Sequence, residues 1–221
     1  MNNPSATSAR FIALEGIDGA GKSSQIGPLV DWLRDRGRTV VTCRDPGSTA
    51  VGDAIRGILL HREDIHPAPT AEMLLYMAAR AQLASEVIGP ALARGDWVVS
   101  DRYLLANVVY QGHAGGLDPD LIRRIGEAAT GGLYPDLVLV LDIDLDTAAR
   151  RLSRPLDKLE NRGDDFRRRL RDGYRAEAAH QPERIRLVDA AAGIDEVGAR
   201  LREAVAEHFA GLLEHGRARH S

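Results

Sequence analysis

One short glycine-rich segment constrains this chain more than any other feature. Residues 16–23 read Gly-Ile-Asp-Gly-Ala-Gly-Lys-Ser, a full match to the pattern G-x-x-x-x-G-K-[ST], directly after the apolar run Phe11–Leu14. Glycines let the backbone turn so that successive N–H groups converge on phosphate oxygens. A helix beginning near Lys22 would direct its positive end at the same anion. This context of strand, loop and helix predicts a nucleoside triphosphate site.

The motif assigns roles to its own residues. Lys22 would supply a mobile charge to the β- and γ-phosphates of the nucleotide, and Ser23 a hydroxyl to Mg²⁺. Asp101 follows the apolar run Trp97–Ser100, where a carboxylate on the magnesium side is expected, although an aspartate there could instead cap a helix. The metal candidates are thus Ser23 and Asp101. The candidate ATP-binding residues are Gly16, Ile17, Asp18, Gly19, Ala20, Gly21, Lys22, Ser23 and Ser24.

Short apolar runs alternate with longer amphipathic segments along the 221 residues. Such alternation predicts a parallel sheet covered on both faces. We therefore expect one domain over residues 1–221, a three-layer α/β/α P-loop NTPase fold with a five-stranded parallel sheet. The expected strands are Phe11–Leu14, Thr39–Cys43, Trp97–Ser100, Leu137–Leu141 and Ile185–Val188. The expected helices begin near Lys22, Val51, Ala71, Asp118, Leu145, Asp165 and Ile194.

Composition excludes several classes of protein. The chain carries 29 Lys and Arg against 32 Asp and Glu, a net charge of −3, which argues against a dedicated nucleic-acid-binding module. No window approaches the roughly 18 apolar residues of a membrane span, so no membrane partner is expected. Residues 1–9 contain no apolar stretch of the kind found in signal peptides and are expected to form a disordered tail. The single cysteine, Cys43, is expected in the core, and a cytoplasmic protein is expected.

A second anionic ligand is indicated by arginines that lie in several segments: Arg44, Arg56, Arg80 and Arg102. Guanidinium groups bind phosphate oxygens in bidentate fashion. The stretch Thr70–Arg94 reads as one long helix with Thr70 as a possible N-cap, and Tyr76 and Arg80 lie four residues apart on one of its faces.

Four segments together resemble the thymidylate kinase family of P-loop nucleoside monophosphate kinases. The first is residues 11–24, and the second is Arg44-Asp-Pro-Gly-Ser-Thr49 with Arg56, which is similar to the pattern R-E-P-G-G-T. The third is Asp101-Arg-Tyr103 followed by Tyr110-Gln-Gly112. The fourth is similar to the lid motif D-R-x-E and the helix after it, and consists of Asp157-Lys-Leu-Glu160 with Phe166, Arg169, Arg171 and Tyr174. This order and spacing cover the chain from about residue 10 to its last helix.

The resemblance implies ATP as donor, dTMP as acceptor and Mg²⁺ as cofactor. By resemblance, Asp18 would accept a hydrogen bond from the 3′-hydroxyl, Arg56 and Arg102 would hold the monophosphate, and Tyr110 would disfavour ribonucleotides at the 2′ position. Tyr76 would stack on thymine, and Arg80 would bond its edge. Adenine is expected near Arg150 and the loop after Asp189. The implied dTMP-binding residues are Asp18, Asp45, Arg56, Tyr76, Arg80, Arg102, Asn107, Tyr110 and Gln111.

The charged stretch Ser153–Asp165 reads as a mobile lid whose cations would close over the transferring phosphoryl group. Arg154, Lys158 and Arg162 are the lid candidates, and the first two are preferred. The implied catalytic residues are Lys22, Asp101, Arg102, Arg154 and Lys158. The family resemblance also implies a homodimer, formed through long helices such as Thr70–Arg94.

Some residues depart from the family pattern. Asp45 replaces Glu and is one methylene shorter, Ser48 replaces a Gly whose backbone could need unusual dihedrals, Ala106 stands where many relatives have Ser or Thr, and Lys158 replaces Arg. Two alternatives therefore stay open. One is a kinase of another monophosphate, such as dUMP. The other is a non-catalytic switch driven by nucleotide binding.

Overall fold

Five parallel strands form the centre of the computed structural model, which describes residues 9–152 and 163–213. The strand order is β2-β3-β1-β4-β5, and every neighbouring pair is parallel. The bounds are β1 (Phe11–Glu15), β2 (Val40–Arg44), β3 (Trp97–Asp101), β4 (Leu137–Asp142) and β5 (Ile185–Asp189). The expected five-stranded parallel sheet and α/β class are confirmed.

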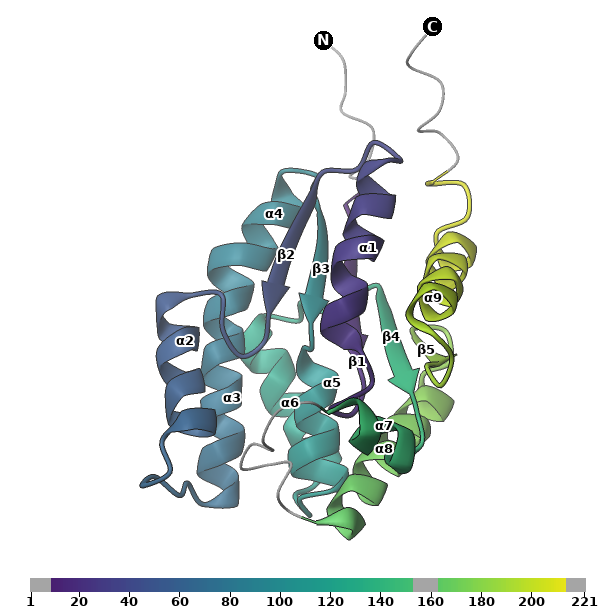
Figure 1. Cartoon of the computed structure of the whole chain (residues 1–221). Coiled ribbons are helices and arrows are strands. Elements are labelled where there is room, and N and C mark those ends of the chain that lie inside the picture. Colours follow the sequence, from purple (N-terminus) through teal and green to yellow (C-terminus); the bar gives the residue numbers. More distant parts are fainter. Residues whose placement is uncertain (1–8, 153–162, 214–221) are drawn as a thin grey trace, which may run out of the picture.

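Helices cover both faces of this sheet (Figure 1). α1 and α9 pack on each other and on the strands, whereas α3, α5, α6 and α8 belong to the other layer. The helical elements are α1 (Lys22–Arg34), α2 (Ala50–Arg56), η1 (Gly57–His61), α3 (Pro69–Leu83), η2 (Ala84–Ile88), α4 (Gly89–Ala93), α5 (Leu104–Asn107), η3 (Val108–His113), α6 (Pro119–Thr130), α7 (Leu145–Arg151), α8 (Asp164–His180) and α9 (Ile194–His208).

The central strand of the sheet is buried. Phe11, Ile12, Ala13 and Leu14 are each 0% exposed, because a middle strand in a three-layer fold is covered from above and below. The same burial applies to β4, where an unbroken apolar run replaces the alternation of a half-exposed strand. Because β2, β3 and β1 are parallel neighbours, their carboxyl ends lie side by side at one edge, where ligands bind in open parallel sheets.

Several element boundaries differ from those expected. Each strand ends one residue later than predicted, and Thr39 lies outside β2. Thr70 is not an N-cap, because Pro69 already occupies the first turn and Ala68 is the capping residue. Asp164 and Asp165 belong to α8 rather than to the lid loop. The helical stretch Leu104–His113 was absent from the expected helices, since no side chain of its own caps it.

Two smaller expectations can be compared directly with the structure. Cys43 is buried in β2, as predicted. Ser48 has φ = 63°, so the unusual dihedral suspected at this position is present on a residue with a side chain. Within residues 9–152 and 163–213, no helix has the length and apolar character that a membrane crossing requires.

Candidate active site

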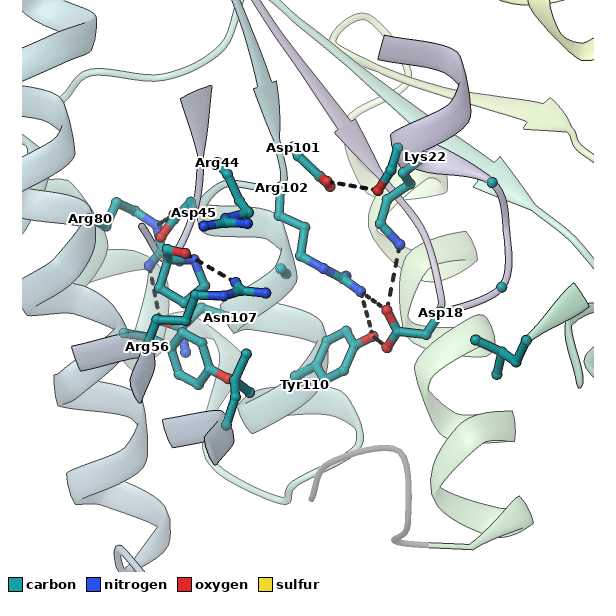
Figure 2. A pocket seen from close by; sticks show the side chains of 18 of the residues that line it. Asp18, Lys22, Arg44, Asp45, Arg56, Arg80, Asp101, Arg102, Asn107 and Tyr110 are labelled. Atoms are coloured by element: carbon teal, nitrogen blue, oxygen red, sulfur yellow. Dashed lines mark hydrogen bonds and ion pairs between the residues drawn. The ribbon is translucent and has the colours of Figure 1, made fainter. Parts of the chain in front are cut away.

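A cavity of about 590 Å³ lies at the carboxyl ends of β1, β2 and β3. It brings the two groups of residues expected from the sequence into one space (Figure 2). From the glycine-rich loop come Asp18, Gly19, Gly21, Lys22, Ser23 and Ser24. From the acceptor group come Asp45, Arg56, Tyr76, Arg80, Arg102, Asn107, Tyr110 and Gln111, together with Asp101.

The glycine-rich loop follows a path that only glycine permits at two points. Gly16 has φ = 134° and Gly19 has φ = 83°. A Cβ at Gly16 would lie 2.7 Å from the carbonyl oxygen of Leu141, and one at Gly19 would lie 2.3 Å from that of Ala148. The loop is therefore pressed against β4 and α7. Ile17 and Ala20 are buried beneath it rather than on the cavity wall.

Lys22 is held in place by the loop that precedes it. Its Nζ donates to the carbonyl oxygens of Gly16 at 2.9 Å and Ile17 at 3.0 Å, and lies 3.8 Å from Asp18. Burial, reinforced by the nearby Arg102 cation, lowers the pKa of Lys22. Phosphate oxygens would stabilise this ammonium better than carbonyl dipoles do.

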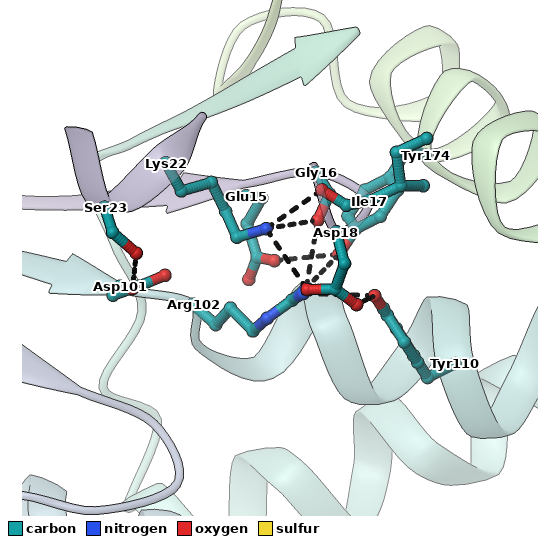
Figure 3. Close-up of polar contacts among 10 residues, drawn as sticks. All are labelled: Glu15, Gly16, Ile17, Asp18, Lys22, Ser23, Asp101, Arg102, Tyr110 and Tyr174. Atoms are coloured by element: carbon teal, nitrogen blue, oxygen red, sulfur yellow. Dashed lines mark hydrogen bonds and ion pairs between the residues drawn. The ribbon is translucent and has the colours of Figure 1, made fainter. Parts of the chain in front are cut away.

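Ser23 and Asp101 meet at the end of β3. The Ser23 hydroxyl donates to Asp101 Oδ2 at 3.3 Å (Figure 3). Asp101 does not cap α5, whose N-cap position is Tyr103 without a side-chain bond, so that alternative is wrong. A hydroxyl and a carboxylate side by side are oxygen donors of the kind that Mg²⁺ uses together with phosphates and waters. These two side chains therefore fit the expected ion.

Arg102 forms hydrogen bonds with several residues around the glycine-rich loop. Its Nη2 donates to Asp18 at 2.6 Å and to the Tyr110 hydroxyl at 3.1 Å, and its Nη1 donates to the Gly16 carbonyl at 3.0 Å. Tyr110 in turn donates to Asp18 Oδ2 at 3.0 Å. Although burial alone would raise it, the pKa of Asp18 lies well below its usual range because Arg102 and Lys22 are close.

Arg80 closes the opposite end of the cavity. Its guanidinium is 1% exposed and forms a buried ion pair with Asp45 Oδ2 through Nε, at 2.5 Å. Nη1 donates to Asn107 at 2.9 Å and to the Met77 sulfur at 3.2 Å, and Nη2 donates to the Tyr103 carbonyl at 3.3 Å. A guanidinium has five N–H groups. One N–H on Nη2 therefore has no acceptor among the described residues.

A chain of amides continues from this guanidinium. Asn107 Nδ2 donates to Gln111 Oε1 at 2.6 Å, and Gln111 Nε2 donates to Glu72 Oε1 at 3.0 Å. Because Arg80 can only donate, Asn107 must turn its oxygen toward Arg80 and its nitrogen away. The donor and acceptor pattern of both amides is thereby fixed. Glu72, at the end of this chain, was not among the residues singled out from the sequence.

The remaining expected residues occupy the rim or lie elsewhere. Arg56 is half-buried, donates to the Pro46 carbonyl at 3.1 Å, and has its pKa lowered by burial and by the neighbouring Arg44. Tyr76 is 9% exposed on the cavity wall.

Arg150 does not line the cavity. Instead Arg151 does, and it donates to the carbonyl oxygens of Ala190, Ala191 and Ala192 in the loop after Asp189. Arg154, Lys158 and Arg162 lie outside the described residues.

Glu15 is a second residue that the sequence analysis missed. Its carboxylate is 0% exposed and accepts from the backbone N–H of Tyr103 at 2.8 Å and of Ala106 at 3.2 Å, and from the Tyr174 hydroxyl at 3.0 Å. Burial raises the pKa of Glu15 to about 7 in spite of Arg102 and these hydrogen bonds. The available signal was a glutamate at the end of an otherwise apolar central strand.

Comparison with known proteins agrees with this geometry. The thymidylate kinase family model matches residues 14–201. The chain is 42% identical over 200 residues to the thymidylate kinase of Bifidobacterium longum strain NCC 2705, covering 89% of this chain and 97% of the relative. It is 44% identical to the thymidylate kinase of Synechococcus sp. strain CC9605 over 91% of this chain and 99% of that protein. The thymidylate kinase of Cupriavidus metallidurans is 45% identical, over 89% and 98%.

This chain belongs to the thymidylate kinase family. The family match includes both the glycine-rich loop and the residues of the acceptor group, and it extends into α9. A shared P-loop alone would not give this coverage. Membership in the thymidylate kinase family makes the chain a nucleoside monophosphate kinase.

The raised pKa of Glu15 predicts a pH dependence of stability. The unfolded chain loses this proton near pH 4.5 and the folded protein near pH 7, so the free energy of unfolding should fall as pH rises between these values. The loss is on the order of 3 kcal/mol. Urea unfolding at pH 4.5 and pH 7.5 should show it in the native protein and not in Glu15→Gln. Parallel pH curves for the two proteins would contradict the assignment.

The buried pair of Arg80 and Asp45 predicts a strong effect on stability. Arg80→Met leaves a buried carboxylate without its cation, which costs about 3–5 kcal/mol. The double variant with Asp45→Asn should unfold at a higher urea concentration than Arg80→Met alone, because it removes the stranded charge. Arg94→Met, which breaks a surface pair with Asp96, is the control and should change little. A loss no larger than that of the control would refute the prediction.

Proposed function

We propose that this protein transfers the γ-phosphoryl group of ATP to dTMP, giving ADP and dTDP. The proposal rests on one observation: the same cavity is lined by the glycine-rich loop and by the buried Arg80, which has one N–H without an acceptor among the described residues. Arg102 extends between these two ends (Figure 2). A nucleotide-driven switch needs the loop alone, whereas Arg56, Arg102 and Tyr76 in the same cavity support a second phosphate site and a surface for a base.

The spare donor of Arg80 favours a particular class of base. Thymine and uracil present a carbonyl acceptor at position 4, where cytosine presents an amino donor. A guanidinium cannot accept a hydrogen bond, so cytosine would leave a donor facing a donor. Tyr76 on the cavity wall offers an aromatic face to the same base. Tyr110, fixed by Asp18 and Arg102, would crowd a 2′-hydroxyl.

The reaction itself needs positioning and charge rather than a covalent intermediate. The loop N–H groups and Lys22 would hold the ATP phosphates, and Arg102 and Arg56 would hold the acceptor phosphate. Ser23 and Asp101 would hold Mg²⁺, which when bound neutralises charge on the donor phosphates. Arg154 and Lys158 are proposed to add cations from the lid at the transition state.

An assay of ADP release tests the acceptor. With ATP and Mg²⁺, turnover should be fastest with dTMP, lower with dUMP, and small with dCMP, dGMP and UMP. Arg102→Ala should raise the KM for dTMP by about 10-fold or more, the size of a lost charged hydrogen bond. Preference for another monophosphate would keep the reaction and overturn the base assignment. Release that does not depend on an acceptor would favour the switch.

We also propose that the kinase works as a cytoplasmic homodimer. α3 packs against α2 and α6, and each of these helices exposes a large apolar side chain. Val51 is 44% exposed, Leu74 48% and Leu121 43%. Apolar side chains gathered on neighbouring helices favour a contact with another protein surface. The cytoplasm supplies the ATP that the reaction uses.

A charge on this surface should separate the subunits. Leu74→Arg should sediment as a monomer at concentrations where the native chain is a dimer, because a buried unpaired cation is costly at an interface. Ile194→Arg is the matched control. Ile194 is 56% exposed on α9, on the opposite side of the molecule (Figure 1). Dimers of equal stability in both variants would place the interface elsewhere.

A further inference from the structure

The turn that presents Arg102 is strained. Arg102 has φ = 67°, a left-handed conformation that costs a residue with a side chain on the order of 1–3 kcal/mol. Tyr103, the next residue, is the N-cap of α5 and supplies no capping side chain. Something outside this segment must therefore hold the turn, because an unsupported backbone would relax out of this region.

Glu15 supplies that support from the neighbouring strand. Its Oε1 accepts from the N–H of Tyr103 and from that of Ala106, the first turn of α5. It thereby does the work of an N-cap side chain, although it lies 88 residues earlier in the chain. The backbone N–H of Arg102 is bonded to Leu14, the residue before Glu15. The end of β1 thus fixes the backbone on both sides of the strained residue.

A second connection reaches the guanidinium itself. The Tyr174 hydroxyl, from α8, donates to Glu15 Oε2 at 3.0 Å and accepts from Arg102 Nη1 at 3.2 Å (Figure 3). Because the hydroxyl has a single proton, donation to Glu15 leaves its lone pairs directed toward Arg102. In its ionised form Glu15 can only accept, and it thereby sets the direction of this hydrogen bond. Glu15 touches neither the loop amides nor Lys22 through any hydrogen bond of the described residues.

We propose that Glu15 is a positioning residue that holds Arg102 in the pose required to bind the acceptor monophosphate, through the backbone of Tyr103 and through the hydroxyl of Tyr174. The inference rests on the proposed function only in taking Arg102 as the acceptor phosphate ligand. It predicts a larger effect on the acceptor than on ATP, because the hydrogen bonds of Lys22 do not involve the Glu15 side chain.

Steady-state kinetics of three variants of the full chain test the proposal. Tyr174→Phe removes only the connection to the guanidinium. Glu15→Gln keeps an acceptor for the Tyr103 N–H and removes the acceptor for the Tyr174 proton. Both should raise the KM for dTMP by about 3- to 10-fold, the value of one hydrogen bond, and should change the KM for ATP by a smaller factor. The double variant should be no worse than Glu15→Gln, since both changes break one connection. Glu15→Ala should be worse than either.

The matched control is Glu177→Gln. Glu177 is also a glutamate buried to 2% exposure, bonded to His113 and Arg123, and outside the cavity. It should lose stability while keeping both KM values. Equal shifts in the KM for dTMP and for ATP, or the same acceptor shift in the control, would overturn the proposal. If the wild-type protein did not turn over dTMP, the proposed function would be refuted instead. The KM values of the variants would then be compared for whichever monophosphate the wild-type protein accepts. Wild-type protein that uses no monophosphate would overturn both.

Discussion

Excess positive charge inside the cavity is the property on which the rest of the site depends. The described lining carries six cationic side chains and three aspartates, although the whole chain has a net charge of −3. Like charges this close repel, and each must be compensated by carboxylates or carbonyls to be buried at all. Asp18 and the Gly16 carbonyl compensate Arg102 and Lys22, and Asp45 compensates Arg80. The positive charge that remains is available to phosphate.

This division separates the cations by role. Arg80 is paired with a buried carboxylate and four of its N–H groups are used within the protein. Arg102 and Lys22 both contact the carboxylate of Asp18 and the carbonyl of Gly16, and the carboxylate of Glu15 also lies close enough to interact with both cations. The end of the cavity at Arg80 therefore holds a buried ion pair, whereas the end at the glycine-rich loop holds the two cations Lys22 and Arg102.

The sequence predicted the sheet and most of the cavity for physical reasons that also show its limits. The loop at residues 16–23 and the apolar runs are local patterns, and local patterns survive folding. Asp45 and Arg80 could be named from the family resemblance, but not their ion pair, because 35 residues separate them. Leu104–His113 escaped prediction because its capping carboxylate comes from Glu15. Arg151 lines the cavity and its neighbour Arg150 does not, because helix phase decides which of two adjacent arginines faces the cavity; the expected adenine site near Arg150 stays a prediction.

The contacts of the Gly16 carbonyl connect the two halves of the site. Lys22 Nζ and Arg102 Nη1 both donate to this one oxygen, at 2.9 Å and 3.0 Å, and Arg102 is one cause of the lowered pKa of Lys22. Because the two cations share one carbonyl oxygen, that oxygen compensates the charge of neither cation fully. A phosphate bound to one cation would reduce the repulsion between the two and leave the carbonyl oxygen to the other. Binding of the donor and of the acceptor would thus favour each other without any change in the sheet. The Gly16 carbonyl can contact both cations because Gly16 lacks a Cβ and lies against Leu141.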